Sequence, residues 1–318
     1  MKAATQSSYG LDSIELTDRP IPTPGPGQVR VRVETASINP ADWHLSTGRP
    51  WFVRLTDGLR RPNREILGTD VAGVIDEVGP GVAPERIGDR VFGKAHGAFA
   101  EVAVADLDRL ALIPERVGFD EAAGLPIAGV TALQAIEKGD VQGKSVVVNG
   151  ASGGVGHFAV QIARALGAAH VTGVCSSRNV EFVRSLGVDQ VVDYTAEDFT
   201  TSPHDVIVEC AGSRTAADLH RGLNPGGRVI MVGPKKGGRM LGPIPSMVAM
   251  MARFAVSDRS LVAFVADETA ERLTTLADLY SDGALHTSVS REFALPDVVS
   301  AFDHLATSRA VGKVLVRP

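Results

Sequence analysis

A cluster of glycines separates a run of valines from an amphipathic stretch in VVVNGASGGVGHFAVQIARALG, residues 146–167. The valines predict a buried strand, and the apolar spacing that follows predicts a helix. Gly153 would let the backbone approach a pyrophosphate at the helix N-terminus, and Gly156 would let helix and strand pack closely. The segment therefore predicts a dinucleotide site, although Ala151 replaces the first glycine of the fingerprint; the alternative is a purely structural turn. Phosphate contacts are expected from Ala151, Ser152, Gly153, Gly154, Val155 and Gly156.

The end of the next predicted strand, HVTGVCSSRN, bears on which dinucleotide binds. A carboxylate there would hydrogen-bond the ribose 2′-hydroxyl of NADH, whereas hydroxyls and a guanidinium suit the 2′-phosphate of NADPH. Ser176, Ser177 and Arg178 stand at this position, and Tyr194 follows the third strand. These residues predict NADPH, the alternative being that Arg178 is a solvated residue at a strand end.

Two further predicted strands end in small residues. Ala211 and Gly212 follow DVIVEC, and Val232 and Gly233 follow VIMV. Ligands of parallel α/β sheets bind outside the carboxyl ends of the strands. We therefore expect these four residues to contribute to the cofactor site.

The elements that position these residues fall into two regions. Residues 28–34, QVRVRVE, alternate apolar and polar side chains, which predicts a half-buried antiparallel strand. Short strands separated by Gly and Pro continue to about 119, whereas unbroken Val/Ile runs alternate with helical patterns from 120. This arrangement predicts an α/β fold with a β-rich domain and a parallel-sheet domain covered on both faces. The pattern alone leaves open whether the tail after about 270 extends the second domain or returns to the first.

Composition narrows the functional classes. The 318 residues carry a formal charge of −5 and only two cysteines, so neither a disulfide framework nor a cysteine-based zinc site is expected. Without a long basic run, a nucleic-acid partner is not expected. The apolar stretch 240–256 is interrupted by Pro243, Pro245 and Arg253, and residues 1–16 contain no signal-peptide core. We expect a cytoplasmic protein without a membrane partner.

Several ordered motifs resemble one known family. ASINPADWHLSTG, ILGTDVAGVIDEVG, GDRVFG, AAGLPIAGVTALQAI, NGASGGVG and GKVLV are similar to the medium-chain dehydrogenase/reductase superfamily, and most to its zinc-free NADPH:quinone oxidoreductases. The resemblance implies a GroES-like catalytic domain (1–119 and 256–318) with an inserted Rossmann NADPH-binding domain (120–255). It also implies a homodimer joined through the Rossmann domains.

The departures from zinc-dependent relatives are informative. Asn39 stands where they have a cysteine ligand, and Gly68-Thr69-Asp70 stands where they have Gly-His-Glu. Because Asn and Thr do not replace thiolate and imidazole in a tetrahedral site, no zinc is expected. Without that Lewis acid, a quinone or conjugated enone is an easier hydride acceptor than a simple carbonyl.

The resemblance also implies which side chains lie near the reacting atoms. Asn39 could hydrogen-bond the nicotinamide ribose or the acceptor, although Asn-Pro is also a common turn start. Asp42 could support it or cap a helix, and the hydroxyl of Thr131 could either face the nicotinamide or bond within its helix. Trp51 and Phe52 could stack on a flat substrate or belong to the core.

Two alternative functions remain open at this stage. One is an enoyl-thioester reductase, which would need a proton donor and a basic patch for its substrate's phosphate arm. The other is an NADPH-binding protein with little turnover. The sequence lacks a GxSxG elbow and an HExxH motif, and no tyrosine has a lysine four residues later, which excludes several other enzyme classes.

Overall fold

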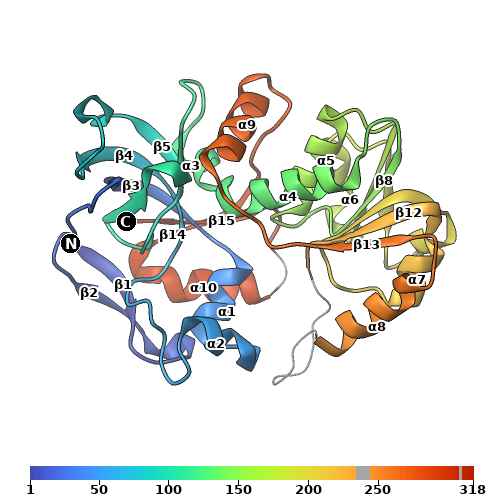
Figure 1. Cartoon of the computed structure of the whole chain (residues 1–318), viewed down its shortest axis with the longest axis horizontal. Coiled ribbons are helices and arrows are strands. Elements are labelled where there is room, and N and C mark those ends of the chain that lie inside the picture. Colours follow the sequence, from blue (N-terminus) through green and yellow to red (C-terminus); the bar gives the residue numbers. More distant parts are fainter. Residues whose placement is uncertain (234–243, 308–309) are drawn as a thin grey trace. The chain divides into compact units, whose positions relative to one another are not determined.

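The computed structural model describes residues 1–233, 244–307 and 310–318, which form two compact units (Figure 1). Unit 1 comprises Met1–Val130 and Asp267–Pro318, and unit 2 comprises Thr131–Ala266. Both divisions fall later in the chain than the sequence-based boundaries at 119/120 and 255/256. The first lies within helix α4 (Pro126–Gly139), and the second follows strand β13 (Ser260–Ala263), which belongs to the sheet of unit 2.

Unit 2 is built on a six-stranded sheet in the order β10-β9-β8-β11-β12-β13, and all of its paired strands are parallel. Counted along the chain, this is the 3-2-1-4-5-6 order of a doubly wound Rossmann sheet. The valine-rich runs form these strands because both faces of the sheet are covered. The strands are β8 (Ser145–Asn149), β9 (His170–Cys175), β10 (Gln190–Asp193), β11 (His204–Glu209), β12 (Leu223–Met231) and β13.

Helices lie on both sides of this sheet, as Figure 1 shows for α5 and α6 on one side and α7 and α8 on the other. Leu219 of α7 and Met250 and Phe254 of α8 pack in one core cluster with Ile207 and Val229 of the sheet. The expected parallel α/β architecture is therefore confirmed. The helices are α5 (Gly156–Ala165), α6 (Val180–Ser185), α7 (Ala216–Arg221) and α8 (Ile244–Ala255).

Unit 1 is β-rich. A seven-stranded sheet follows the order β14-β15-β3-β4-β5-β7, with β6 also paired to β3, and β1 and β2 form a separate pair. All pairs are antiparallel except β14 with β15. The strands are β1 (Lys2–Gln6), β2 (Ile14–Asp18), β3 (Gln28–Ile38), β4 (Asp70–Val78), β5 (Arg90–Lys94), β6 (Val102–Asp106), β7 (Leu110–Leu112), β14 (Val289–Ala294) and β15 (Lys313–Arg317).

The predicted alternation along β3 is confirmed. Val29, Val31 and Val33 are buried in the core of unit 1, where Phe99 meets Phe302 edge to face. The remaining helices of unit 1 are α1 (Pro40–Thr47), α2 (Arg54–Asp57), α3 (Phe119–Ala123), α9 (Ala270–Ser281) and α10 (Val298–Ala306). No helix among the described residues is both long enough and apolar enough to cross a membrane.

Candidate active site

The phosphate turn of unit 2 joins the end of β8 to the start of α5. A Cβ added at Gly156 would lie 2.1 Å from the carbonyl oxygen of Gly150, so only glycine allows the helix to pack this close to the turn. A Cβ added at Gly153 would meet the same oxygen at 3.4 Å, an ordinary contact, and no other atom lies within 4 Å. Space at Gly153 is therefore open, which fits the approach of a pyrophosphate.

The other residues of the turn are of two kinds: some form hydrogen bonds within the protein, and others have free backbone donors among the described residues. Ala151 is fully buried, and its N–H donates to the carbonyl oxygen of Val174 at 3.0 Å, so this residue holds the turn against β9. The hydroxyl of Ser152 accepts from Asn179 Nδ2 at 2.9 Å. The N–H groups of Gly154 and Val155 find no acceptor within the described part of the chain. These donors at the start of a helix fit an anion.

The carboxyl ends of the central strands meet at one edge of the sheet. Asn149 pairs with Glu209, and Glu209 pairs with Met231. Chain order reverses between β8 and β11, which is where doubly wound sheets bind their ligands. The backbone N–H groups of Val232 and Gly233 both donate to the carbonyl oxygen of Glu209. The structure thus gathers three strand ends and the small residues predicted after them at one edge.

Glu209 is a buried carboxylate that the sequence analysis did not single out. Its two carboxylate oxygens accept from Asn149 Nδ2 at 3.0 and 2.8 Å. One of them also accepts from the N–H groups of Ala211 at 3.0 Å and Gly212 at 2.7 Å. Burial raises the pKa of this carboxyl, and the hydrogen bonds oppose the rise. Glu209 therefore fixes the loop that carries two of the predicted cofactor residues.

Some of the residues at the predicted 2′-phosphate site form hydrogen bonds within the protein. The hydroxyl of Ser177 lies 2.9 Å from that of Thr195, and Thr195 donates to Asp193. Hydrogen bonds from Ser177 and Thr195 hold the pKa of Asp193 below its usual range, so this carboxylate is ionised at neutral pH. Arg178 is exposed and has no ion pair among the described residues, and Tyr194 is 54% exposed. The guanidinium of Arg178 and the carboxylate of Asp193 thus both belong to the strand ends that were predicted to meet the ribose.

A second polar cluster lies inside unit 1, where the register of three strands brings distant residues together. Ser37 of β3 pairs with Asp70 of β4, and Ile38 pairs with Val314 of β15. Asn39 follows β3 directly and therefore lies beside Lys313, the first residue of β15. Strands β15, β3 and β4 all lie in the interior of the sheet, and the side chains of Ser37, Asn39, Asp70 and Lys313 are buried.

The contacts within this cluster are short. Lys313 Nζ donates to Asn39 Oδ1 at 2.6 Å and lies 3.9 Å from a carboxylate oxygen of Asp70. Asn39 Nδ2 donates to that oxygen at 2.9 Å, and Ser37 donates to it at 3.2 Å. Because an ammonium can only donate, it fixes which end of the Asn39 amide is the oxygen. One Nδ2 hydrogen of Asn39 is thereby bonded to Asp70.

Burial dominates the electrostatics of the cluster. Lys313 is 2% exposed, Asp70 is fully buried and Asp42 is 3% exposed. Burial and the nearby charge of Asp70 raise the pKa of Asp42 to about 7. Burial also raises the pKa of Asp70 to about 6, although the ammonium of Lys313 opposes this. Burial lowers the pKa of Lys313, and the two carboxylates oppose that change.

Asp42 acts as a helix cap in this structure. Its carboxylate accepts from the backbone N–H of Asn39 at 2.8 Å at the start of α1. The capping alternative considered from the sequence therefore matches an observed contact, while Asn39 directs its own side chain to Lys313 and Asp70.

The remaining predicted residues take different environments. Trp51 is 51% exposed and Phe52 is half-buried, both in the short helix η2 (Trp51–Val53) of unit 1. Thr131 is half-buried and is the first residue of unit 2. Residues 247–251, which contain three methionines and were not among the predicted site residues, lie in α8, where Met250 is buried in the core and Met251 is 62% exposed.

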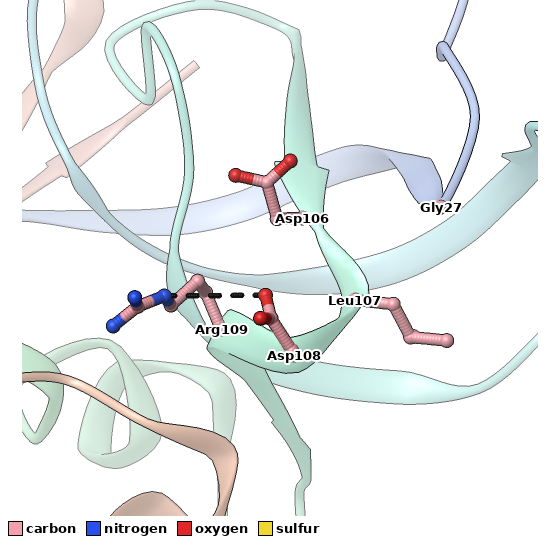
Figure 2. A pocket seen from close by; sticks show the side chains of 5 residues that line it. All are labelled: Gly27, Asp106, Leu107, Asp108 and Arg109. Atoms are coloured by element: carbon pink, nitrogen blue, oxygen red, sulfur yellow. Dashed lines mark ion pairs between the residues drawn. The ribbon is translucent and has the colours of Figure 1, made fainter.

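Figure 2 shows a surface pocket of unit 1 lined by Gly27, Asp106, Leu107, Asp108 and Arg109. Its charged groups already have partners in the protein. Asp106 accepts from Gln28 at 2.9 Å, and Arg109 pairs with Asp267 at 2.7 Å. None of the predicted site residues lines this pocket, and we assign it no ligand.

Comparisons with known proteins agree with both units. The model of the alcohol dehydrogenase GroES-like domain matches residues 25–115, and that of the zinc-binding dehydrogenase matches 186–316. A chloroplast envelope quinone oxidoreductase homolog of Arabidopsis thaliana is 36% identical over 100% of this chain and 98% of its own. An NADPH-dependent alkenal/one oxidoreductase of the same plant is 31% identical over 100% and 80%. The solved quinone oxidoreductase from Coxiella burnetii, 29% identical, superposes with a TM-score of 0.87 over 100% and 99%.

The chain belongs to the medium-chain dehydrogenase/reductase superfamily. Within it, the chain falls in the quinone oxidoreductase-like family of oxidoreductases. Membership of this dehydrogenase/reductase superfamily implies a nicotinamide cofactor. The family and the two-part fold predicted from the sequence are thereby confirmed.

One of the two family models is named for zinc, and the donor set of this medium-chain dehydrogenase/reductase does not fit that metal. The candidate ligand positions carry an amide at Asn39 and a hydroxyl at Thr69. Lys313 places an ammonium against Asn39 and Asp70, and a second cation there would be repelled. No cluster of three or more His, Cys, Asp or Glu side chains suited to a metal occurs among the described residues.

The stability of the Asp42→Asn variant at different pH values tests the raised pKa of Asp42. Between the ordinary value of 3.8 and about 7, folded Asp42 keeps a proton that the unfolded chain has released, so its contribution to stability falls as pH rises. The variant cannot ionise, and its free energy of unfolding at pH 8 should exceed that of the wild type by about 2 kcal/mol. At pH 4, near the ordinary value of 3.8, the two proteins should nearly agree in urea denaturation.

Asp282→Asn, at the exposed end of α9, is the matched control, because it removes the same formal charge from the surface of the protein. If Asp42→Asn were equally less stable at both pH values, capping by the charged carboxylate would outweigh its burial.

Proposed function

We propose that the protein is a zinc-independent oxidoreductase that reduces a quinone or conjugated enone with NADPH. The observation that carries the proposal is the buried Lys313–Asn39–Asp70 cluster, in which an ammonium contacts Asn39, the residue that the family resemblance aligns with a zinc ligand. The names of the plant and bacterial relatives support the class of acceptor, and one of them includes NADPH.

The residues of the chain bind and orient the reactants. The glycine turn at Gly153 accommodates the pyrophosphate, and Glu209 holds the loop of Ala211 and Gly212. The bound nicotinamide supplies the hydride. The acceptor gains two electrons with it, and a proton from water completes the reduction; conjugation spreads the charge that arrives first, so no metal is needed.

Asn39 is the proposed polar contact in the catalytic unit. Lys313 and Asp70 lock its amide in one orientation, and its second Nδ2 hydrogen is available to the nicotinamide ribose or to the acceptor oxygen. Asp42 is a positioning residue that holds the backbone of Asn39. We also propose Thr131 of unit 2 as a contact of the nicotinamide, and Trp51 and Phe52 of unit 1 as contacts of a flat acceptor.

Two finer points belong to the proposal. Exposed Met247, Val248 and Met251 on α8, together with the edge strand β13, support a homodimer through unit 2. The cytoplasm is the proposed location. Light scattering at several protein concentrations tests the dimer.

Oxidation of NADPH with a benzoquinone, a short enone and an enoyl thioester tests the function. We expect turnover with the quinone or the enone and little with the thioester. Tight NADPH binding without turnover on any acceptor would contradict the enzyme proposal and favour a binding protein. A strong preference for the thioester would favour the enoyl-thioester reductase instead.

Arg178→Ala tests the choice of cofactor. If its unpaired guanidinium binds the 2′-phosphate, the dissociation constant of NADPH should rise roughly tenfold while that of NADH stays the same. Asp193→Asn is the complementary variant, because removing the adjacent charge should tighten NADPH and leave NADH unchanged or weaker. Equal effects of Arg178→Ala on both cofactors, measured by fluorescence titration, would show that Arg178 does not read the phosphate.

A further inference from the structure

One short segment of unit 1 carries a charge opposite to that of the whole chain. Residues 49–64, RPWFVRLTDGLRRPNR, contain five arginines and one aspartate, a formal charge of 5 − 1 = +4. The chain as a whole has a formal charge of −5, so the other residues together carry −9. We call residues 49–64 the basic segment. Because the charge of the basic segment is opposite to that of the other residues, the surface around it has a positive potential.

The structure leaves much of this positive charge free. Arg49, Arg60 and Arg61 are exposed, and none of them has an ion pair among the described residues. The one acid of the segment, Asp57, is 4% exposed and pairs with Arg64 at 3.1 Å. The acid therefore neutralises an arginine that is already half-buried and leaves the three exposed guanidiniums uncompensated.

Large apolar side chains stand among these arginines. Trp51, Leu55 and Leu59 are 51%, 62% and 59% exposed. Trp51 and Leu55 are four residues apart across η2 and α2, so they lie on the same side of the helical turns. Figure 1 draws α2 at the periphery of unit 1. Exposed tryptophan and leucine interleaved with free arginines are the surface chemistry of interfacial membrane binding.

We propose that the basic segment binds the surface of an anionic lipid bilayer. Arg49, Arg60 and Arg61 meet the headgroup phosphates, while Leu55 and Leu59 enter the boundary of the acyl chains. A nucleic acid or an acidic protein would satisfy the arginines, but a nucleic acid gives the exposed leucines no partner. The inference changes the sequence-based expectation of no membrane partner, which rested on the lack of a spanning segment.

The inference stands apart from the proposed function, because it rests on the surface of unit 1 and not on the acceptor. Membrane binding would nevertheless complement the proposed function, because a protein held at a bilayer has direct access to acceptors dissolved in lipid. Trp51, the proposed acceptor contact, belongs to the same segment.

Flotation of the whole protein with lipid vesicles tests the proposal. The protein should float with vesicles of phosphatidylcholine and phosphatidylglycerol, and it should not float with phosphatidylcholine alone. Salt should release it, because surface charges are screened over roughly 8 Å at physiological ionic strength. Arg60→Gln/Arg61→Gln should weaken binding roughly tenfold or more. Arg116→Gln/Arg253→Gln, which removes the same charge from exposed arginines elsewhere, should not.

The apolar part has its own pair of variants. Leu55→Ser/Leu59→Ser should weaken vesicle binding several-fold and keep the rate of NADPH oxidation with a water-soluble quinone. Ile87→Ser/Leu112→Ser, at residues 52% and 53% exposed, is the matched control and should bind vesicles like the wild type. On binding, the fluorescence of Trp51 should shift to the blue in Trp43→Phe, where it is the remaining tryptophan.

Wild-type protein that fails to float with the anionic vesicles would overturn the proposal. So would equal loss of binding in the Arg60/Arg61 and Arg116/Arg253 variants, because net charge alone would then explain it. Full competition by free glycerol phosphate, with no effect of the leucine variant, would assign the arginines to a soluble phosphate instead. Each result is independent of whether the protein reduces quinones.

Discussion

Lys313→Met is expected to lower the free energy of unfolding by about 3 kcal/mol at pH 8, because it leaves a buried carboxylate without its cation. Methionine keeps the length of the side chain, so most of the change is electrostatic. The destabilisation should shrink toward pH 5, since Asp70, whose pKa is raised to about 6, then takes up a proton. Urea denaturation at the two pH values measures both effects.

A double variant separates charge from catalysis. Lys313→Met/Asp70→Asn removes both charges and should recover much of the lost stability. It should nevertheless keep a kcat/KM with quinone roughly tenfold or more below the wild type, because the Asn39 amide is no longer held from both ends. Recovery of activity together with stability would show that Lys313 has only a structural role.

Gly156→Ala is expected to have the second large effect. The new Cβ would lie 2.1 Å from the carbonyl oxygen of Gly150 and 2.8 Å from its carbonyl carbon, both backbone atoms that cannot turn away. Helix α5 would have to move off the turn, at a cost of about 3 kcal/mol. Thermal unfolding and NADPH titration should both register the change.

Gly153→Ala is the matched variant in the same turn. Its Cβ would make only an ordinary contact at 3.4 Å, so the stability should hardly change. Because the methyl group would fill the space proposed for the pyrophosphate, the dissociation constant of NADPH should still rise roughly tenfold. A Gly153→Ala protein with wild-type affinity would place the pyrophosphate elsewhere, and a fully stable Gly156→Ala protein would contradict the tight packing.

The sequence was most informative where the signal is local. The glycine turn, its strand and its helix are contiguous, and spacing alone predicted them. The alternation of valines with polar residues in β3 likewise predicted a half-buried strand, because a strand that buries one face has an apolar side chain at every second position. The family resemblance added that the β-rich unit is GroES-like and that the tail returns to it, which pattern alone had left open.

The Lys313 cluster could not be predicted in the same way. Lys313 and Asn39 are 274 residues apart, and only the register of β15 against β3 brings them together. The one available signal was a lysine directly before the apolar run VLV at the start of a strand. The role of Glu209 could not be predicted for a similar reason. Its partners are Asn149 on a neighbouring strand and backbone groups of the following loop.

The boundary between the units also depends on pairing. The sequence SLVA at residues 260–263 is compatible with a strand in either unit. Its parallel pairing with β12 assigns it to unit 2. The arginines of the basic segment were visible in the sequence, but the structure was needed to show that three of them form no ion pair with any described residue and that Asp57 is buried.

The rate of NADPH oxidation with a quinone, measured before and after treatment with a zinc chelator, tests the central claim most directly. The buried ammonium of Lys313 is proposed to stand in place of a metal, so the account predicts the same rate in both samples and no stimulation by added zinc. Loss of the rate on chelation, with recovery on adding zinc, would contradict it.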